Sequence, residues 1–106
     1  MNETNIPTAT PALTLKQACY LLHDPTRWLI LRELSKGETL PVGELVRRLD
    51  CTRDSVSRHL GAMRKLGVVD LAYGQLYMLA PAYRPAPGTA TIDFGHFIAR
   101  LDTPAS

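Results

Sequence analysis

The sequence predicts a mainly α-helical domain that carries one small β-hairpin. Two observations point to this class. Four segments between residues 14 and 66 repeat apolar residues at helical spacing, and each is bounded by residues that typically start or stop a helix. Directly after them, the stretch VVDLAYGQLYMLA predicts two short strands, about 68–72 and 76–80, joined around Gly74.

Length and composition exclude several classes of protein. The chain has 106 residues, of which 45% are hydrophobic and 21% charged, and this suits one domain with a small core. No run approaches the roughly 18 consecutive apolar residues of a membrane span, and residues 1–11 lack the features of a secretory signal. Two cysteines, Cys19 and Cys51, are too few for a disulfide framework. We therefore expect a cytoplasmic protein without membrane contact.

The first two helices are predicted from their capping residues. Thr14 is placed to cap a helix over 14–23. Its recurring apolar residues are Leu15, Ala18 and Leu22. Asp24 can accept bonds from free N–H groups and Pro25 suits the first helical position, so a second helix starts here. Apolar residues cover most of its circumference, which predicts a central buried helix over 26–35.

The next two helices form a helix-turn-helix pattern. Pro41 opens a third helix, whose apolar residues are Val42, Leu45, Val46 and Leu49. Asp50 and Cys51 break the pattern, and Thr52 caps a fourth helix over 52–66. The narrow apolar stripe of that helix is Val56, Leu60 and Met63. Two amphipathic helices around a short turn, followed by a hairpin that serves as a wing, are typical of a winged helix-turn-helix.

The flanking segments complete the predicted domain organisation. Residues 1–12 are rich in Thr and Pro without periodicity, so we expect a disordered N-terminal tail. After the hairpin, the prolines and the glycine of 81–88 force an extended link. A final amphipathic helix over about 92–101 is then predicted from Phe94, Phe97, Ile98 and Leu101. The domain is therefore expected over 13–101, with a short C-terminal tail at 102–106.

Positive charge is concentrated in one part of the chain. The net charge is only +2, but the segment from Arg47 to Lys65 contains six basic and two acidic residues, which is a local charge of +4. The rest of the chain carries −2. A solvated helix face is the simplest meaning of scattered charge, whereas such a local excess suggests a surface that binds a polyanion.

Three stretches carry a resemblance to a known family. They are LLHDPTRWLILRELSKGE (21–38), GELVRRL (43–49) and SVSRHLGAMRKLGVV (55–69). With this spacing the chain resembles the ArsR/SmtB family of bacterial winged-helix transcription regulators over about residues 13–79, with a looser fit of the last helix. The resemblance implies a dimer that binds operator DNA and usually represses transcription until an inducer binds.

The fourth predicted helix is the candidate for DNA contact. The second helix of a helix-turn-helix enters the major groove with its N-terminal residues. We expect contacts from six residues: Thr52, Arg53, Ser55, Ser57, Arg58 and His59. Arg53 or Arg58 can bond guanine O6 and N7 bidentately, and the hydroxyl groups can bond phosphates or bases. His59 enters through the resemblance, which implies a position near the DNA backbone.

Two features depart from the family pattern. Asp54 stands where the family usually has a small polar residue, and we interpret it as favouring the helix dipole rather than as reading cytosine. The wing tip, Ala72-Tyr73-Gly74-Gln75, is uncharged where relatives commonly carry Arg or Lys. We therefore expect the DNA affinity to fall less steeply with salt than in relatives with basic wings.

The resemblance also raises the question of a sensor site. The thiolate pair of metal-sensing relatives is missing, because Pro and Gly stand in the matching stretch 40–43. Asp93 and His96 are one residue too far apart for the pair that other relatives carry on the last helix. Cys19 and His23 lie four residues apart on one helix face, a geometry that suits metal ligation. A buried cysteine beside an interface histidine is the simpler interpretation.

The remaining chemistry is sparse. We interpret Cys51 as a packing residue, while a thiol switch with Cys19 stays open because the distance between the two decides it. No Ser/His/Asp spacing, phosphate-binding loop or paired carboxylates accompany a pocket, so we predict neither an enzyme nor a bound cofactor. The nature of an inducer, whether a small molecule or a metal, stays open.

We expect the protein to act as a homodimer on double-stranded DNA. Relatives dimerise through the first and last helices, and a lone domain would expose an apolar stripe there. The predicted interface residues are Leu15, Leu22, Phe94, Phe97, Ile98 and Leu101. Two recognition helices would then meet half-sites about 34–36 Å apart. The alternative is a winged-helix protein-interaction module without DNA binding, which the bare wing and Asp54 favour and the local charge opposes.

Overall fold

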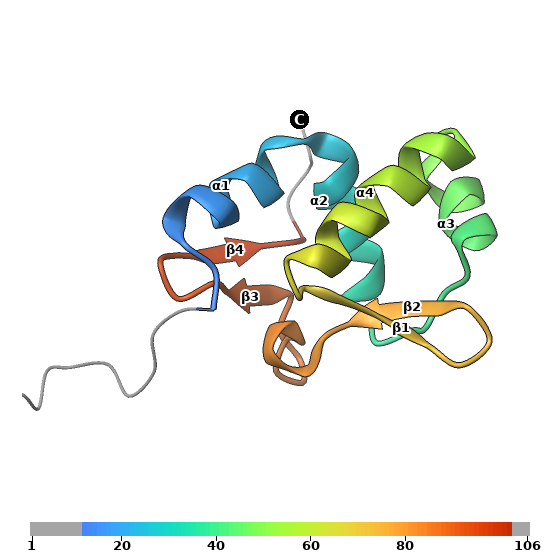
Figure 1. Cartoon of the computed structure of the whole chain (residues 1–106). Coiled ribbons are helices and arrows are strands. Elements are labelled where there is room, and N and C mark those ends of the chain that lie inside the picture. Colours follow the sequence, from blue (N-terminus) through green and yellow to red (C-terminus); the bar gives the residue numbers. More distant parts are fainter. Residues whose placement is uncertain (1–11, 103–106) are drawn as a thin grey trace, which may run out of the picture.

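Four helices lead into two β-hairpins within the described part of the chain, residues 12–102 (Figure 1). The computed structural model places α1 at Leu15–His23, α2 at Pro25–Leu34, α3 at Val42–Leu49 and α4 at Arg53–Lys65. Each bound lies within one residue of the predicted helix. The predicted tails lie outside the described residues, apart from residues 12 and 102. Among the described residues, no helix has the length and apolar content that a membrane span requires.

The predicted capping residues start three of these helices. Thr14 and Gln17 form a capping box at α1, in which each side chain accepts a hydrogen bond from the backbone N–H of the other. An oxygen of Asp24 accepts from the backbone two residues ahead at 2.6 Å, and the hydroxyl of Thr52 accepts from three residues ahead at 3.2 Å. Because these side chains satisfy N–H groups that a helix leaves unpaired, the helix starts could be predicted from the sequence.

The wing is confirmed at its predicted place. Strand β1 (Val69–Ala72) pairs antiparallel with β2 (Leu76–Leu79), and Ala72 lies opposite Leu76. The three-residue connection contains two consecutive residues with positive φ, Gly74 at 84° and Gln75 at 63°. On the other edge of β2, Leu40 and Tyr77 exchange backbone hydrogen bonds of 2.9 and 2.8 Å. This bridge fastens the loop between α2 and α3 to the wing.

The predicted last helix over 92–101 is wrong. In the structure this segment is a second antiparallel hairpin, made of β3 (Thr91–Asp93) and β4 (Ile98–Arg100). Its turn is closed by a hydrogen bond of 2.9 Å from the N–H of Phe94 to the carbonyl of Phe97. The final element is therefore a pair of strands, and the second sheet was not predicted at all.

A glycine at the turn explains the error. Gly95 has a φ of 87° and stands first of the two turn residues, where a two-residue hairpin favours glycine, and its N–H donates to the carboxylate of Asp93 at 2.8 Å. A mid-helix glycine costs about 1 kcal/mol relative to alanine, so the helix was disfavoured as well. The four apolar residues that suggested the helix also fit a hairpin, because a short apolar run does not distinguish the 3.6-residue period of a helix from the two-residue period of a strand.

This second hairpin closes one side of the core. Its inward residues are Ile92, Phe94, Ala99 and Leu101, all of them buried. The ring of Phe94 lies 5.7 Å from that of Tyr83 and 5.6 Å from that of Phe97, measured between centroids. Tyr83 belongs to the short 3₁₀ helix η2 (Pro81–Tyr83) of the proline-rich link. Figure 1 shows the hairpin packed below α1, so the two ends of the domain meet.

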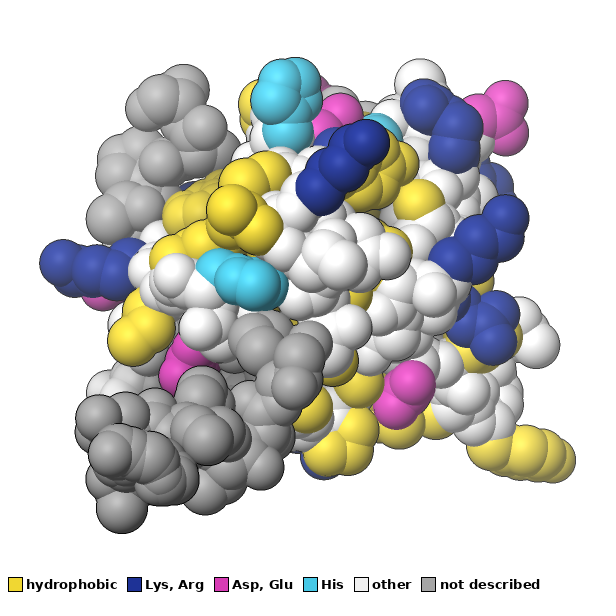
Figure 2. All heavy atoms as spheres, turned by 60° about the vertical axis from the view of Figure 1, so that its left-hand side comes forward, with side chains coloured by type: hydrophobic (Ala, Val, Ile, Leu, Met, Phe, Trp, Pro, Cys, Tyr) yellow, Lys and Arg dark blue, Asp and Glu magenta, His cyan; other side chains and the backbone are white. Residues whose placement is uncertain are grey.

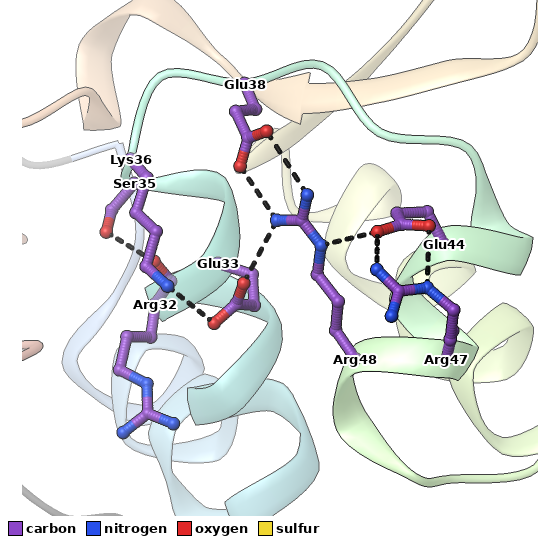
Figure 3. Close-up of polar contacts among 8 residues, drawn as sticks. All are labelled: Arg32, Glu33, Ser35, Lys36, Glu38, Glu44, Arg47 and Arg48. Carbon is purple, nitrogen blue, oxygen red and sulfur yellow. Dashed lines mark hydrogen bonds and ion pairs between the residues drawn. The ribbon is translucent and has the colours of Figure 1, made fainter.

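An ion-pair network ties α3 to α2 (Figure 3). The guanidinium of Arg48 lies 2.7 Å from Glu38, 2.8 Å from Glu44 and 3.2 Å from Glu33. These carboxylates belong to the loop after α2, to α3 and to α2, so one guanidinium joins three segments. Glu44 also accepts hydrogen bonds from Arg47, the residue that precedes Arg48 on α3.

The two arginines make Glu44 a strong acid. Hydrogen bonds from Arg47 and from Arg48 lower the pKa of Glu44 from 4.5 to about 2. A carboxyl whose pKa is lower in the folded state stabilises the fold fully above its unfolded pKa. This contribution is therefore present above pH 4.5 and is lost as the pH falls toward 2.

We predict that Arg48→Ala lowers the melting temperature at pH 7 because it leaves the buried carboxylate of Glu33 with Lys36 as its one remaining ion-pair partner among the described residues. The melting temperature should also fall less steeply with acid below pH 4.5. Arg47→Ala is the matched control, since Arg47 is mostly exposed and pairs with Glu44 alone. Thermal unfolding followed by circular dichroism measures both, and equal melting temperatures for the two variants would contradict the network's role.

Candidate nucleic-acid interface

Helix α4 has one buried and one exposed face. The predicted stripe of Val56, Leu60 and Met63 is fully buried. It packs α4 against α2, α3 and β1. The first turn is held by the hydroxyl of Thr52, which accepts from the N–H of Ser55. Because the buried stripe fixes the rotation of the helix about its axis, the polar residues of α4 must face outward.

Five of the six predicted DNA-contacting residues lie on the surface at the N-terminal half of α4. Thr52, Arg53, Ser57 and Arg58 are exposed, and Ser55 is half-buried. The hydroxyl oxygen of Thr52 already accepts a hydrogen bond within the protein, so its O–H remains to donate to an external oxygen. The structure thus gathers two guanidinium groups and three hydroxyl groups on one short surface.

Ion pairing decides which basic residues are available to a polyanion. The charges of Arg47 and Arg48, which belong to the basic stretch, are balanced by the carboxylates of the network. Across residues 12–102, no ion pair involves the four basic residues of α4, which are Arg53, Arg58, Arg64 and Lys65. Figure 2 shows Lys and Arg side chains gathered along one edge of the molecule. The uncompensated positive charge therefore belongs to α4 and not to the whole stretch from Arg47 to Lys65.

The acidic partners of the network were missed in the sequence. Glu44 precedes Arg47 and Arg48 by three and four residues, a spacing that pairs charges on one helix, so this pairing could have been predicted. Glu33 and Glu38 come from another helix and from a loop, and only the fold brings them to Arg48. A charge count along the chain cannot include such partners.

His59 is placed differently from the other predicted contacts. Its side chain is buried, with 7% of the residue exposed. The imidazole Nδ1 lies 3.2 Å from a guanidinium nitrogen of Arg27, and Nε2 lies 3.4 Å from the carboxylate of Asp24. This histidine therefore joins α4 to the start of α2, and we leave it out of the surface that meets DNA.

The wing presents an aromatic tip without positive charge. Tyr73 is fully exposed at the turn between β1 and β2. Residues 69–79 contain no Lys or Arg, and Asp70 is their one charged residue. Asp54, the other feature that departs from the family pattern, is exposed in the first turn of α4, where a carboxylate interacts favourably with the helix dipole.

The residues predicted for a dimer interface divide into three groups. Leu15 and Ile98 are 54% and 64% exposed. Leu22 and Phe97 are partly buried against the core. Phe94 and Leu101 are buried within the monomer, so their assignment to the interface is wrong: the alternation of the hairpin turns them inward. Tyr20 on α1, which the sequence reasoning missed, is 50% exposed; it lies outside the predicted stripe of Leu15, Ala18 and Leu22 and therefore gave no signal.

Apolar side chains gather on the side of the molecule formed by α1 and the β3–β4 hairpin. Figure 2 looks at this side and shows hydrophobic side chains collected on it, next to a histidine. The exposed large hydrophobic residues there are Leu15, Tyr20 and Ile98. Such a patch on a small domain indicates an interaction surface.

The candidate sensor residues do not converge. Cys19 and His23 are both exposed on α1, and within residues 12–102 no three His, Cys, Asp or Glu side chains form a metal-binding group. The thiol of Cys51 donates to the carbonyl of Leu49 at 3.3 Å, and both cysteines are free thiols. On the second hairpin, Asp93 binds the turn, as described above, and His96 contacts the carbonyl of Leu13 at 2.8 Å.

Comparison with known proteins agrees with this geometry. Residues 21–72 match a family model described as a helix-turn-helix domain. The matched segment runs from α1 to β1 and includes both helices of the motif. No curated protein matches the chain. Residues 21–72 are thus similar to helix-turn-helix domains, which are typical of DNA-binding regulators.

Proposed function

We propose that this protein is a cytoplasmic transcription regulator of the ArsR/SmtB type, which binds a palindromic operator as a homodimer and represses transcription. The observation that carries the proposal is the exposed face of α4. It presents four basic side chains that form no ion pair among the described residues, beside three hydroxyl groups, within a segment that matches helix-turn-helix domains. No catalytic role is proposed.

The geometry of α4 favours contact through its N-terminal half. Arg53 and Ser57 lie one helical turn apart, as do Asp54 and Arg58. Either arginine can donate two hydrogen bonds to one guanine, while the hydroxyl groups and Arg64 bind phosphates. Direct base reading thus needs only the first two turns of the helix, and the remaining basic residues supply affinity without sequence preference.

The apolar side formed by α1 and β4 supports the homodimer. Leu15, Tyr20 and Ile98 would be covered when two copies meet about a two-fold axis. Two α4 helices would then address half-sites about 34–36 Å apart. In this arrangement a strand, and not a helix, supplies the C-terminal part of the interface.

Two alternatives rest on other features. The uncharged wing and Asp54 favour a protein-interaction module, which would not bind DNA. The pair of Cys19 and His23, exposed four residues apart on α1, favours a metal or redox sensor whose site is completed by the second copy. The regulator and the sensor are compatible, since a dimer brings two such pairs to one interface.

The test of the proposal is the selection of bound fragments from genomic DNA of the source organism. We expect enrichment of a short sequence with two-fold symmetry, with release on addition of an inducer. Repeating the selection with zinc, arsenite and an oxidant examines the sensor alternative. Failure to enrich any sequence, together with the absence of salt-dependent DNA binding, would reject the regulator in favour of the protein-interaction module.

Replacing Arg58 with alanine should weaken operator binding by about 5- to 150-fold, equivalent to about 1–3 kcal/mol, most strongly at one base position. Arg58→Lys keeps the charge and should lose the base preference while retaining most of the salt dependence. The matched control is Lys16→Ala, which removes an exposed cation from α1 instead. Fluorescence anisotropy on operator and mutated-operator duplexes measures the effect. An Arg58→Ala variant with unchanged affinity would place the DNA-binding surface elsewhere.

Ile98→Glu should give a folded monomer, because Ile98 is mostly exposed in the single chain and a carboxylate there opposes its copy across the two-fold axis. Its melting temperature should be close to that of the parent at protein concentrations where both are monomeric. Gln75→Glu, on the wing, is the control for an added charge. Sedimentation equilibrium reports the mass. A parent protein that stays monomeric at high concentration would contradict the dimer.

The wing should contribute little to the salt dependence of DNA binding. Salt dependence reflects the phosphates that Lys and Arg neutralise, and the wing tip has neither. Tyr73→Ala and Gln75→Ala should therefore leave the slope of log affinity against log salt unchanged within about one unit. Anisotropy titrations at several salt concentrations measure it, and a slope that collapses in either variant would show that the wing binds phosphates.

A further inference from the structure

A polar cluster with two buried members joins the DNA-facing helix to the junction of α1 and α2. We call the four residues Tyr20, Asp24, Arg27 and His59 the Arg27–His59 cluster. Arg27 is 5% exposed and His59 is 7% exposed, so both polar side chains are removed from water. Buried polar groups of this kind are stable only when their hydrogen bonds are satisfied within the protein.

Arg27 is anchored on α1. Its Nε donates to the carbonyl of Leu21 at 3.0 Å, and its Nη2 donates to the carbonyl of Tyr20. The guanidinium also lies over the ring of Tyr20, 4.2 Å from the centroid. These carbonyls belong to the last turns of α1, where a cation is favoured by the helix dipole. Arg27 is thereby held in place from the α1 side.

The remaining contacts fix the protonation state of His59. A guanidinium only donates hydrogen bonds, so the Nδ1 of His59, 3.2 Å from Nη1 of Arg27, must be an acceptor without a proton. The ring proton then lies on Nε2, which points at the carboxylate of Asp24 at 3.4 Å. The contact between α4 and α2 therefore requires the neutral imidazole with its proton on Nε2.

We propose that the Arg27–His59 cluster is a proton-sensitive lock that holds α4 in the position required for DNA binding; the inference rests on the proposed function. Adding a proton to Nδ1 turns the acceptor into a donor that faces another donor. It also places two cations at hydrogen-bond distance. The hydrogen bond between Arg27 and His59 then breaks, and α4 loses its polar anchor on the α1–α2 junction, which leaves its apolar stripe as the remaining constraint on its orientation.

The groups around His59 act in opposite directions. Burial lowers the pKa of His59 below 6.5, the charge of Asp24 raises it, and the charges of Arg27 and Arg58 lower it further. The ring of Tyr20 lies under the guanidinium of Arg27. The net direction favours the neutral ring, which is the locked form, at neutral pH. Acidification below the ordinary histidine pKa therefore opens the lock.

The lock predicts a pH dependence opposite in sign to simple electrostatics. Acidification adds positive charge to the protein, which by itself strengthens binding to a polyanion. Opening of the lock instead removes the fixed spacing of two recognition helices and weakens specific binding. A fall in operator affinity on acidification thus distinguishes the lock from ordinary charging.

The experiment is a titration of operator binding by the full chain between pH 7.5 and 5.5. The probe is the duplex found by fragment selection. We expect the affinity to fall by about threefold to tenfold, as one coupled proton changes an equilibrium by up to about tenfold per pH unit. His23→Gln combined with His96→Gln leaves His59 as the one histidine and should keep this fall. His59→Asn keeps an acceptor toward Arg27 but does not titrate, and should not show this fall.

A second readout does not depend on DNA. The imidazole of His59, followed by NMR in the free protein, should titrate below 6.5 with the Nε2-protonated form at neutral pH. The melting temperature should fall below pH 6.5, because the pKa is lower in the folded state, and His59→Asn should remove that fall. A His59 pKa at or above 6.5 would overturn the lock.

The outcomes separate the two proposals. Operator affinity that is constant or rises on acidification, or a His59→Asn variant that retains the fall, would reject the lock while leaving the regulator intact. If no duplex is bound at any pH, the proposed function fails. The NMR titration and the melting temperatures then decide whether the lock positions α4.

Discussion

A buried guanidinium holds together the three helices on which the candidate DNA-binding surface depends. Arg27 cannot lose its proton within a protein, so its burial between α1, α2 and α4 must be offset by acceptors on all sides. The carbonyls at the end of α1 and the imidazole of His59 on α4 supply them. Because leaving such a charge unpaired costs several kcal/mol, these elements are held in one relative arrangement. The orientation of α4 is therefore fixed by its polar contact with Arg27 as well as by its apolar stripe.

Local signals explain why the helices and the wing could be predicted from the sequence. Thr14, Asp24 and Thr52 act within three residues of their own position, and the apolar spacing within each helix reports its own buried face. The wing likewise follows from a turn residue between two short apolar runs. These features need no knowledge of the rest of the chain.

The C-terminal hairpin could not be predicted with the same method because two local signals conflicted. The spacing of Phe94, Phe97, Ile98 and Leu101 matches one face of a helix over two turns, yet Gly95 favours a turn near the start of the run. Tertiary packing resolves the conflict. As strands, the segment buries Phe94 against Tyr83 and Leu101 in the core, whereas a helix would place all four apolar residues on one side.

The candidate site depended on contacts between distant segments, and this is where the sequence was least informative. The local charge of +4 was a correct count, but Arg48 meets carboxylates that lie up to fifteen residues away, so the count overstated the charge available to DNA. His59 shows the same limit, because its neighbour Arg27 is 32 residues earlier in the chain. Only residues whose exposure follows from helical spacing alone, such as Arg53 and Arg58, could be assigned to the surface.

The change from a helix to a hairpin also changes what a partner copy would meet. A helix with four apolar residues on one face offers a continuous ridge, whereas β4 offers one outward apolar side chain, Ile98, between the inward-facing neighbours of the strand. Most of the apolar contact must then come from α1, through Leu15 and Tyr20. Tyr20 also lies against Arg27, so the surface proposed for the second copy and the cluster that positions α4 share a side chain. If two copies meet on this surface, Tyr20 is covered by the partner while its ring still lies over the guanidinium that contacts His59.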